Sequence, residues 1–150
     1  MLLAGLFLAL PGFTQVSRTI DHTTYDIHQV PANWIDSAKA KLDIVYWRAS
    51  HGTQLTEGGM TALINFSTAN AELYNFDEHG GDGVLKLVEF LEDLEHQNDT
   101  WVATTEAYLA DHPDVNTVMW AWCGIDGMDA GQYLTDMEML IAKYGPGGSE

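Results

Sequence analysis

Two apolar segments decide the fold of this chain: residues 42–47, which read LDIVYW, and residues 115–122, which read VNTVMWAW. Both are rich in β-branched and aromatic residues, and both have the length of a strand that is buried on both faces. The first segment ends at small and polar residues, and the second lies between Pro113 and Gly124. We therefore predict two buried strands, each followed directly by a turn.

Apolar residues at helical spacing surround these two segments. Between residues 84 and 94 they recur at i, i+3, i+4, i+7 and i+10, which is typical of one face of an amphipathic helix. The sequence predicts helices at residues 32–40, at residues 84–94, between the cap Asp99-Thr100 and His112-Pro113, and at residues 130–144. Residues 60–83 contain several asparagines and glycines, and we expect an irregular surface excursion there.

This order of elements favours an α/β fold in which parallel strands are covered by helices. In such a fold, ligands bind just beyond the carboxyl ends of the strands. The last predicted helix stops at residues 145–148 (GPGG), where an alternating fold would continue with a further parallel strand. The sequence therefore predicts an incomplete sheet whose C-terminal strands and helices are missing.

Charge and cysteine content exclude several classes of function. The 150 residues, enough for one domain, include 6 Lys and Arg against 22 Asp and Glu, a net charge of −16. Such a surface repels nucleic acid and anionic membranes, so we expect neither as a partner. Cys123 is the only cysteine, which excludes an internal disulfide, a thiolate zinc cluster and a CxxC redox pair.

The N-terminus predicts export. Residues 2–10 form an apolar run that is too short to cross a bilayer, and Pro11 and Gly12 follow it. We interpret residues 1–15 as a signal peptide and residues 20–150 as the partial domain, which places the protein outside the cytoplasm, secreted or periplasmic. The alternative is a buried N-terminal strand or helix.

The turns after the two strands carry the candidate chemistry. Ser50 follows the first strand, where free backbone N–H groups can stabilise an oxyanion, although it can equally cap a helix or turn. His51 is adjacent to Ser50 in sequence and therefore a weak partner for it. After the second strand, Gly124 permits close approach of a bound group, while we expect Cys123 to be a small buried hydrophobe. Trp122 is either a core residue or part of a sugar-binding cleft.

We predict neither a metal nor a nucleotide cofactor. The acidic residues around Asp77 and Asp82 lack the calcium-loop pattern and are expected to form a solvated loop. No phosphate-binding glycine motif follows a strand. The histidines show no metal-ligand spacing; they are His22, His28, His51, His79, His96 and His112.

The turn that reads ASHGTQ, together with the strand end that reads VMWAWCG, resembles a branch of secreted bacterial proteins related to the SGNH (GDSL-like) hydrolases. The resemblance covers roughly residues 30–145. It implies a flavodoxin-like three-layer fold with a serine nucleophile just after the first strand, oxyanion donors from later turns, and a base from a late Asp-x-x-His segment. No cofactor is implied.

Residue by residue, the resemblance assigns the nucleophile to Ser50 and an oxyanion donor to Gly124, with Asp126 in the place of the family's asparagine. His51, Gln54 and Trp122 are the expected substrate contacts. A carboxylate cannot donate a hydrogen bond unless it is protonated, and the late histidine segment has no counterpart after residue 144. We therefore expect a serine esterase or deacylase domain for small-molecule or acetylated carbohydrate esters that is inactive as this fragment. The alternative is a non-catalytic extracellular carbohydrate-binding or interaction module that uses the aromatic residues around Trp47 and Trp122.

Overall fold

The computed structural model describes residues 21, 23, 26–92, 94, 100–124 and 129–148. The chain divides into two units, Met1–Val30 and Pro31–Glu150. In the first unit, Asp26 caps the short 3-10 turn η1 (Ile27–Gln29) by accepting a hydrogen bond from the backbone N–H of His28. The predicted signal peptide, residues 1–15, lies outside the described residues.

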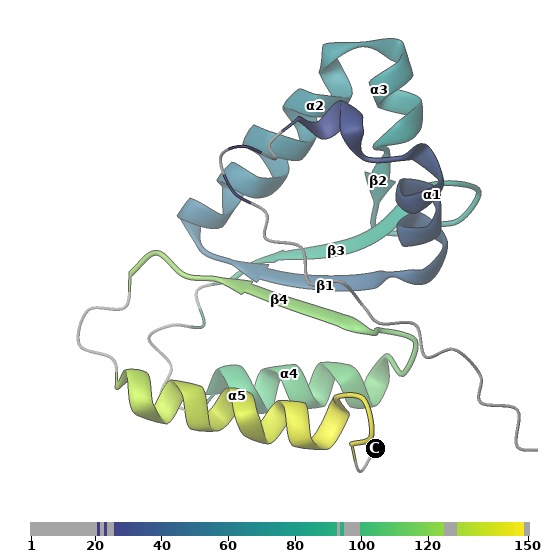
Figure 1. The fold of residues 1–150 in the computed structure, drawn as a ribbon. Coiled ribbons are helices and arrows are strands. Elements are labelled where there is room, and N and C mark those ends of the chain that lie inside the picture. Colours follow the sequence, from purple (N-terminus) through teal and green to yellow (C-terminus); the bar gives the residue numbers. More distant parts are fainter. Residues whose placement is uncertain are drawn as a thin grey trace, which may run out of the picture. The chain divides into compact units, whose positions relative to one another are not determined.

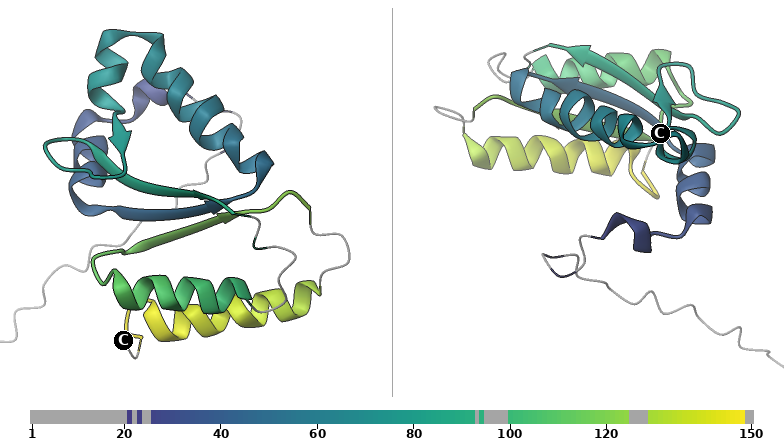
Figure 2. Two further views of the ribbon diagram at one scale, coloured as in Figure 1. Left: turned by 180° about the vertical axis from the view of Figure 1, so that it is seen from behind. Right: turned by 90° about the horizontal axis from the view of Figure 1, so that it is seen from above.

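The second unit is an α/β structure built on a four-stranded sheet with the strand order β2-β3-β1-β4. Every neighbouring pair of strands is parallel. The elements are α1 (Ala32–Lys41), β1 (Asp43–Arg48), η2 (Ser50–Gly52), η3 (Gln54–Met60), α2 (Thr61–Phe66), α3 (Thr68–Leu73), β2 (Phe76–Asp77), β3 (Leu85–Leu91), α4 (Thr100–Asp111), β4 (Thr117–Ala121) and α5 (Ala130–Tyr144). Figures 1 and 2 show α4 and α5 along one face of the sheet, and α2 and α3 on the other. The predicted α/β class with a helix-flanked parallel sheet is confirmed.

Strand β1 is an interior strand of the sheet, and its residues 44–47 are apolar on both faces. Val45 and Trp47 point into a core cluster that α4 and α5 cover. Ile44 and Tyr46 alternate with them and belong to a second cluster on the opposite face. The predicted strand at residues 42–47 is thus confirmed with a shift of one residue, and its burial on both faces explains why it has no polar alternation.

The prediction of a helix at residues 84–94 is wrong, because this segment forms strand β3, which pairs with β1. Leu85 and Leu87 face one core cluster, whereas Phe90 packs against the other. Because β3 is covered on both faces, apolar residues occur along it without strict alternation. A short apolar segment of this kind is also compatible with one face of a helix. Pairing with β1, a contact distant in sequence, decides between the two.

The predicted irregular excursion at residues 60–83 is also wrong in part. It contains the two short helices α2 and α3 and the edge strand β2. The hydroxyl of Ser67 caps α3 by accepting a hydrogen bond from the N–H of Asn70, 3.1 Å away. The expected loop is found at residues 78–84, in which Gly80, Gly81 and Gly83 adopt positive φ.

The other predicted helices are confirmed. Helices α1 and α4 occupy the expected segments, and α5 has the predicted ends. Asp129 caps α5 by accepting hydrogen bonds from the N–H groups of Gly131 and Gln132. Within the part of the chain that the structure describes, no helix has both the length and the apolar character needed to span a membrane.

Candidate functional site

The turns that follow β1 and β4 meet at one edge of the sheet, where the carboxyl ends of the parallel strands lie. The two strands are parallel neighbours, with Arg48 opposite Ala121 at their carboxyl ends. The N–H of Ala49 donates to the carbonyl oxygen of Ala121 at 2.9 Å, which continues the strand pairing by one residue. Ser50 and Cys123, each two residues beyond its strand, are therefore held side by side.

The centre of this site is a contact between a hydroxyl and a thiol. Ser50 Oγ lies 2.7 Å from Cys123 Sγ, and either atom can be the donor. The Ser50 side chain is exposed and the Cys123 side chain is partly exposed. The prediction that Cys123 is a small buried hydrophobe is therefore wrong, because β4 ends early enough for the thiol to reach the surface beside the β1 turn.

The surroundings of Cys123 favour its thiolate. Hydrogen bonding from the Ser50 hydroxyl is the largest effect that lowers the pKa of the Cys123 thiol, and the backbone N–H of His51 is the next. Burial, the third-largest effect, raises this pKa, whereas the ring of His51 and the N–H of Ser50 lower it by smaller amounts. Donors from one short turn thus converge on the sulfur atom, and such convergence is a common way to stabilise an anion.

Gly52 fixes the turn against the sheet because it has no side chain. A Cβ atom at this position would lie 2.4 Å from Arg48 Cβ and 2.7 Å from the hydroxyl oxygen of Tyr46. That hydroxyl donates to the carbonyl oxygen of Gly52 at 3.2 Å from a buried position. The turn η2 is thus packed directly on β1 and β4, with Ser50 and His51 on its outer side.

A buried polar network lies beneath the turn. The guanidinium of Arg48, 7% exposed, donates to Glu89 on β3, to Thr53 Oγ1 at 3.2 Å and to Glu57 at 3.1 Å. The hydroxyl of Thr56, which lies on η3 beside Glu57, donates to the Glu89 carboxylate at 2.7 Å. The segment η3 is a π-helix, a conformation that is rare and occurs frequently at functional sites.

The remaining predicted site residues occupy different environments. His51 and Gln54 are exposed, at the turn and at the start of η3 respectively, and Gly124 is exposed next to Cys123. The ring of Trp122 is half-buried and makes an edge contact with Tyr133, with ring centroids 4.3 Å apart. Asp126 lies outside the described residues.

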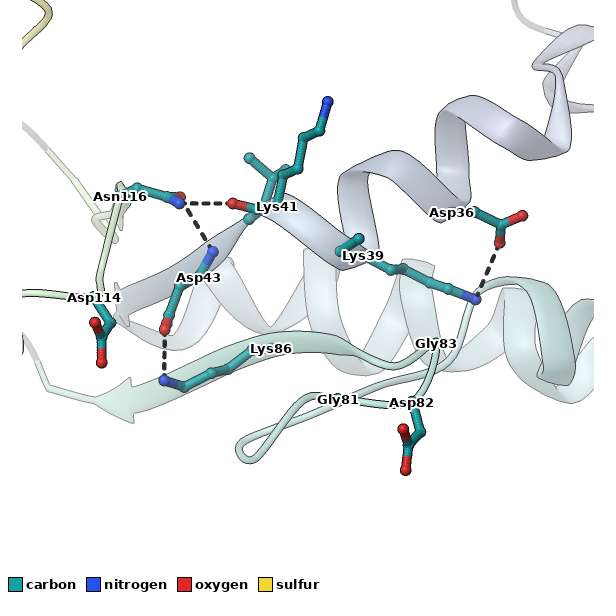
Figure 3. Close-up of a pocket in the computed structure, with 12 residues that line it drawn as sticks. Asp36, Lys39, Lys41, Asp43, Gly81, Asp82, Gly83, Lys86, Asp114 and Asn116 are labelled. Carbon is teal, nitrogen blue, oxygen red and sulfur yellow. Dashed lines mark hydrogen bonds and ion pairs between the residues drawn. The ribbon is translucent and has the colours of Figure 1, made fainter.

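A charged cavity of about 470 Å³ lies at the other edge of the sheet, where the strands begin. Figure 3 shows that its side chains pair with one another: Lys86 Nζ lies 2.5 Å from Asp43 Oδ2, and the Asn116 amide donates to the carbonyl oxygen of Lys41 at 2.7 Å. The backbone N–H of Asp43 donates to Asn116 Oδ1 at 3.1 Å, which ties the starts of β1 and β4 together. We interpret this cavity as structural.

Sequence reasoning missed Cys123 and Arg48 as members of the site. No basic residue is a sequence neighbour of Cys123. The donors that act on its thiol come from residues 50 and 51, in the turn that follows β1. The available signal was the rule that parallel neighbours bring their carboxyl ends together, which applies to Cys123 as well as to Gly124. Among the described residues, no group of three or more His, Cys, Asp or Glu side chains is arranged to hold a metal ion.

Chemically, this edge offers two nucleophilic atoms, Ser50 Oγ and Cys123 Sγ, beside backbone donors that can stabilise negative charge. No protein-family model matches the chain, and the comparisons with curated proteins and with solved structures return no match.

Proposed function

We propose that this chain carries the nucleophile site of an exported serine hydrolase of the SGNH type, in which Ser50 attacks the carbonyl carbon of an ester. The observation that carries the proposal is the contact between Ser50 and Cys123, the residue before Gly124, at the carboxyl ends of β1 and β4. A nucleophile at this edge is exposed to substrate and adjacent to the N–H groups of the turn. Acyl or acetyl esters, including acetylated carbohydrates, are the proposed substrates.

The reaction divides into two displacements. A bond forms between Ser50 Oγ and the acyl carbon, the ester C–O bond breaks, and the proton of the hydroxyl finally reaches the departing alcohol. Water then releases the acyl group as an acid and restores the hydroxyl. Among the described residues, the Ser50 hydroxyl hydrogen-bonds to the Cys123 thiol.

A second candidate uses the same edge with the sulfur as the nucleophile. It is favoured by the lowered pKa of the Cys123 thiol, because the thiolate is the reactive form. In this case the Ser50 hydroxyl donates to the Cys123 thiolate, which attacks the acyl carbon. The ester C–O bond breaks, the alcohol leaves with a proton, and water then hydrolyses the thioester to an acid and the thiol. The two candidates share a substrate class and differ in the atom that is acylated.

The binding-module alternative has less support. Trp47 is only 2% exposed, and its ring packs against Phe90 and Tyr108. A sugar ring cannot stack on a tryptophan face that other rings already cover. The half-buried ring of Trp122 is likewise engaged with Trp101 and Tyr133.

Acylation by p-nitrophenyl acetate tests the proposal. We expect release of p-nitrophenol and an acetyl group on Ser50 that resists neutral hydroxylamine, located by peptide mass spectrometry. The Ser50→Ala variant removes this adduct, whereas Thr68→Ala, which removes an exposed hydroxyl on α3, retains it. A hydroxylamine-labile acetyl group on Cys123 alone supports the second candidate instead. Acetylation of neither residue contradicts both.

A further inference from the structure

We propose that Arg48 is a positioning residue of this site: acting through Thr53, its guanidinium fixes the orientation of the turn that presents Ser50 to Cys123. The inference rests on the proposed function for the role of Ser50, but the positioning itself can be measured at Cys123 whether or not the protein hydrolyses esters.

The guanidinium of Arg48 has three hydrogen-bond partners. Arg48 donates from three different nitrogen atoms: Nε to Glu89, one terminal nitrogen to Thr53 Oγ1 and the other to Glu57. These partners lie on β3, at the residue just before η3 and within η3. One side chain thus connects the central strand to the strand beside it and to the segment that follows the site turn.

The Arg48 side chain is buried in the protein. Arg48 is 7% exposed and Thr56, which shares the Glu89 carboxylate, is 2% exposed. A buried charge needs hydrogen-bond partners in fixed directions. A buried N–H donor without a partner gives up its hydrogen bonds to water and gains none from the protein, which destabilises the fold. The planar guanidinium has such fixed directions, so its three contacts constrain one another.

The Thr53 hydroxyl makes two hydrogen bonds, and the direction of each is fixed by its partner. An arginine side chain can only donate, so Thr53 Oγ1 must accept from Arg48. The single proton of this hydroxyl then remains for the carbonyl oxygen of Ser50, to which Thr53 also hydrogen-bonds. Arg48 therefore orients the hydroxyl, and the hydroxyl holds the peptide group that follows Ser50.

That peptide group matters because its N–H belongs to His51. The backbone N–H of His51 is the second-largest cause of the lowered pKa of Cys123. If the peptide after Ser50 rotates, its N–H turns away from the sulfur and the hydroxyl of Ser50 shifts with it. Loss of the Thr53 link should therefore weaken both of the main contacts to Cys123.

Thr53→Val tests the link, because it removes the hydroxyl and keeps the shape of the side chain. We expect the pH profile of Cys123 alkylation by iodoacetamide to move to higher pH, and acetylation of Ser50 by p-nitrophenyl acetate to slow by about tenfold or more. Thr53→Ser keeps the hydroxyl and should restore both readouts to wild-type values. Far-ultraviolet circular dichroism establishes that each variant is folded.

Arg48→Lys provides a second, independent variant. A lysine keeps the charge, but a single ammonium on a flexible stem cannot hold three partners in the directions of the guanidinium. We expect the same shift of the alkylation profile as for Thr53→Val. If both folded variants keep the wild-type profile and the wild-type acetylation rate, the positioning role is wrong. If the profile shifts although Ser50 is never acetylated in any form, the positioning role stands and the proposed function fails.

Discussion

Ser50 Oγ and Cys123 Sγ lie 2.7 Å apart, although 73 positions separate the two residues in the sequence. The contact exists because β1 and β4 are parallel neighbours and each ends two residues before its reactive side chain. A hydroxyl and a thiol at this distance influence the protonation of each other, and the consequence can be measured directly.

Replacement of Ser50 by alanine should raise the pKa of the Cys123 thiol. The Ser50 hydroxyl is the largest of the effects that lower this pKa, so its removal favours the protonated thiol. At a fixed pH below the pKa the thiolate fraction falls, and alkylation by iodoacetamide at pH 7 should slow severalfold, as measured by mass spectrometry. Thr68→Ala is the control. An unchanged pH profile for Ser50→Ala would contradict the assigned contact.

Gly52→Ala should destabilise the protein, whereas Gly124→Ala should not. The new Cβ at position 52 would meet Arg48 Cβ at 2.4 Å and Ala121 Cβ at 3.0 Å, and neither belongs to a flexible side-chain end. Overpacking of this kind costs about 1–3 kcal/mol. At Gly124 nothing lies within 4 Å of the added atom. Urea denaturation of the two variants measures the difference, and equal midpoints would show that the turn can move away from the sheet.

Trp101→Ala should cost about 3–5 kcal/mol of unfolding free energy, the usual range for deletion of a large buried aromatic side chain. Trp101 is 2% exposed, and its ring stacks on that of Tyr133 with centroids 4.8 Å apart. Trp34, which is 69% exposed on α1, provides the matched control, and Trp34→Ala should change the stability little. Thermal denaturation followed by circular dichroism distinguishes the two, and comparable melting temperatures would count against the α4–α5 core.

The ion pair between Lys86 and Asp43 should make stability depend on pH in the alkaline range. The hydrogen bond to Asp43 is the main cause that raises the pKa of Lys86. The stabilisation is complete below the pKa of the unfolded lysine, about 10.4, and is lost as the pH rises through the higher pKa of the folded state. The difference in melting temperature between wild type and Lys86→Met should thus be largest near neutral pH and shrink above about pH 10.

Lys41→Met is the control for this experiment, because the Lys41 side chain extends away from Asp43 and Lys86 in Figure 3. Its melting temperature should differ from that of the wild type by a small amount with little pH dependence. A pH-independent difference for Lys86→Met would mean that the ion pair does not stabilise the fold.

The sequence predicts an element correctly where the apolar pattern, the length of the segment and its flanking residues all indicate the same type of element. The apolar runs that became β1 and β4 have flanking turns, and α5 has a cap and a glycine stop, so their positions followed from local chemistry. Strand β3 could not be assigned in this way, because LKLVEFL is compatible with a helical stripe and with a strand buried on two faces. The alignment of β3 with β1, such as Leu87 beside Ile44, decides the matter, and local sequence does not contain it.

The site could be predicted in part. The rule that ligands bind beyond the carboxyl ends of parallel strands pointed to the turn that carries Ser50, and in the structure Ser50 lies beside Cys123, just past the end of β4. The role of the thiol could not be inferred, because the effects on the Cys123 pKa come from backbone and side-chain groups of a turn distant in sequence. The network of Arg48 was equally hidden, since its carboxylate partners, Glu57 and Glu89, lie at unrelated spacings.

The internal use of Arg48 also shapes the electric field outside the molecule. Of only six basic side chains, four are held in ion pairs within the described structure: Lys39, Arg48, Lys86 and Lys143. The chain has a net charge of −16, and these four cations already lie beside carboxylates. A dissolved anion meets repulsion on approach, and a neutral or cationic molecule does not. Encounter rates with the Ser50 edge should consequently rise with ionic strength for anionic esters and stay nearly constant for uncharged ones.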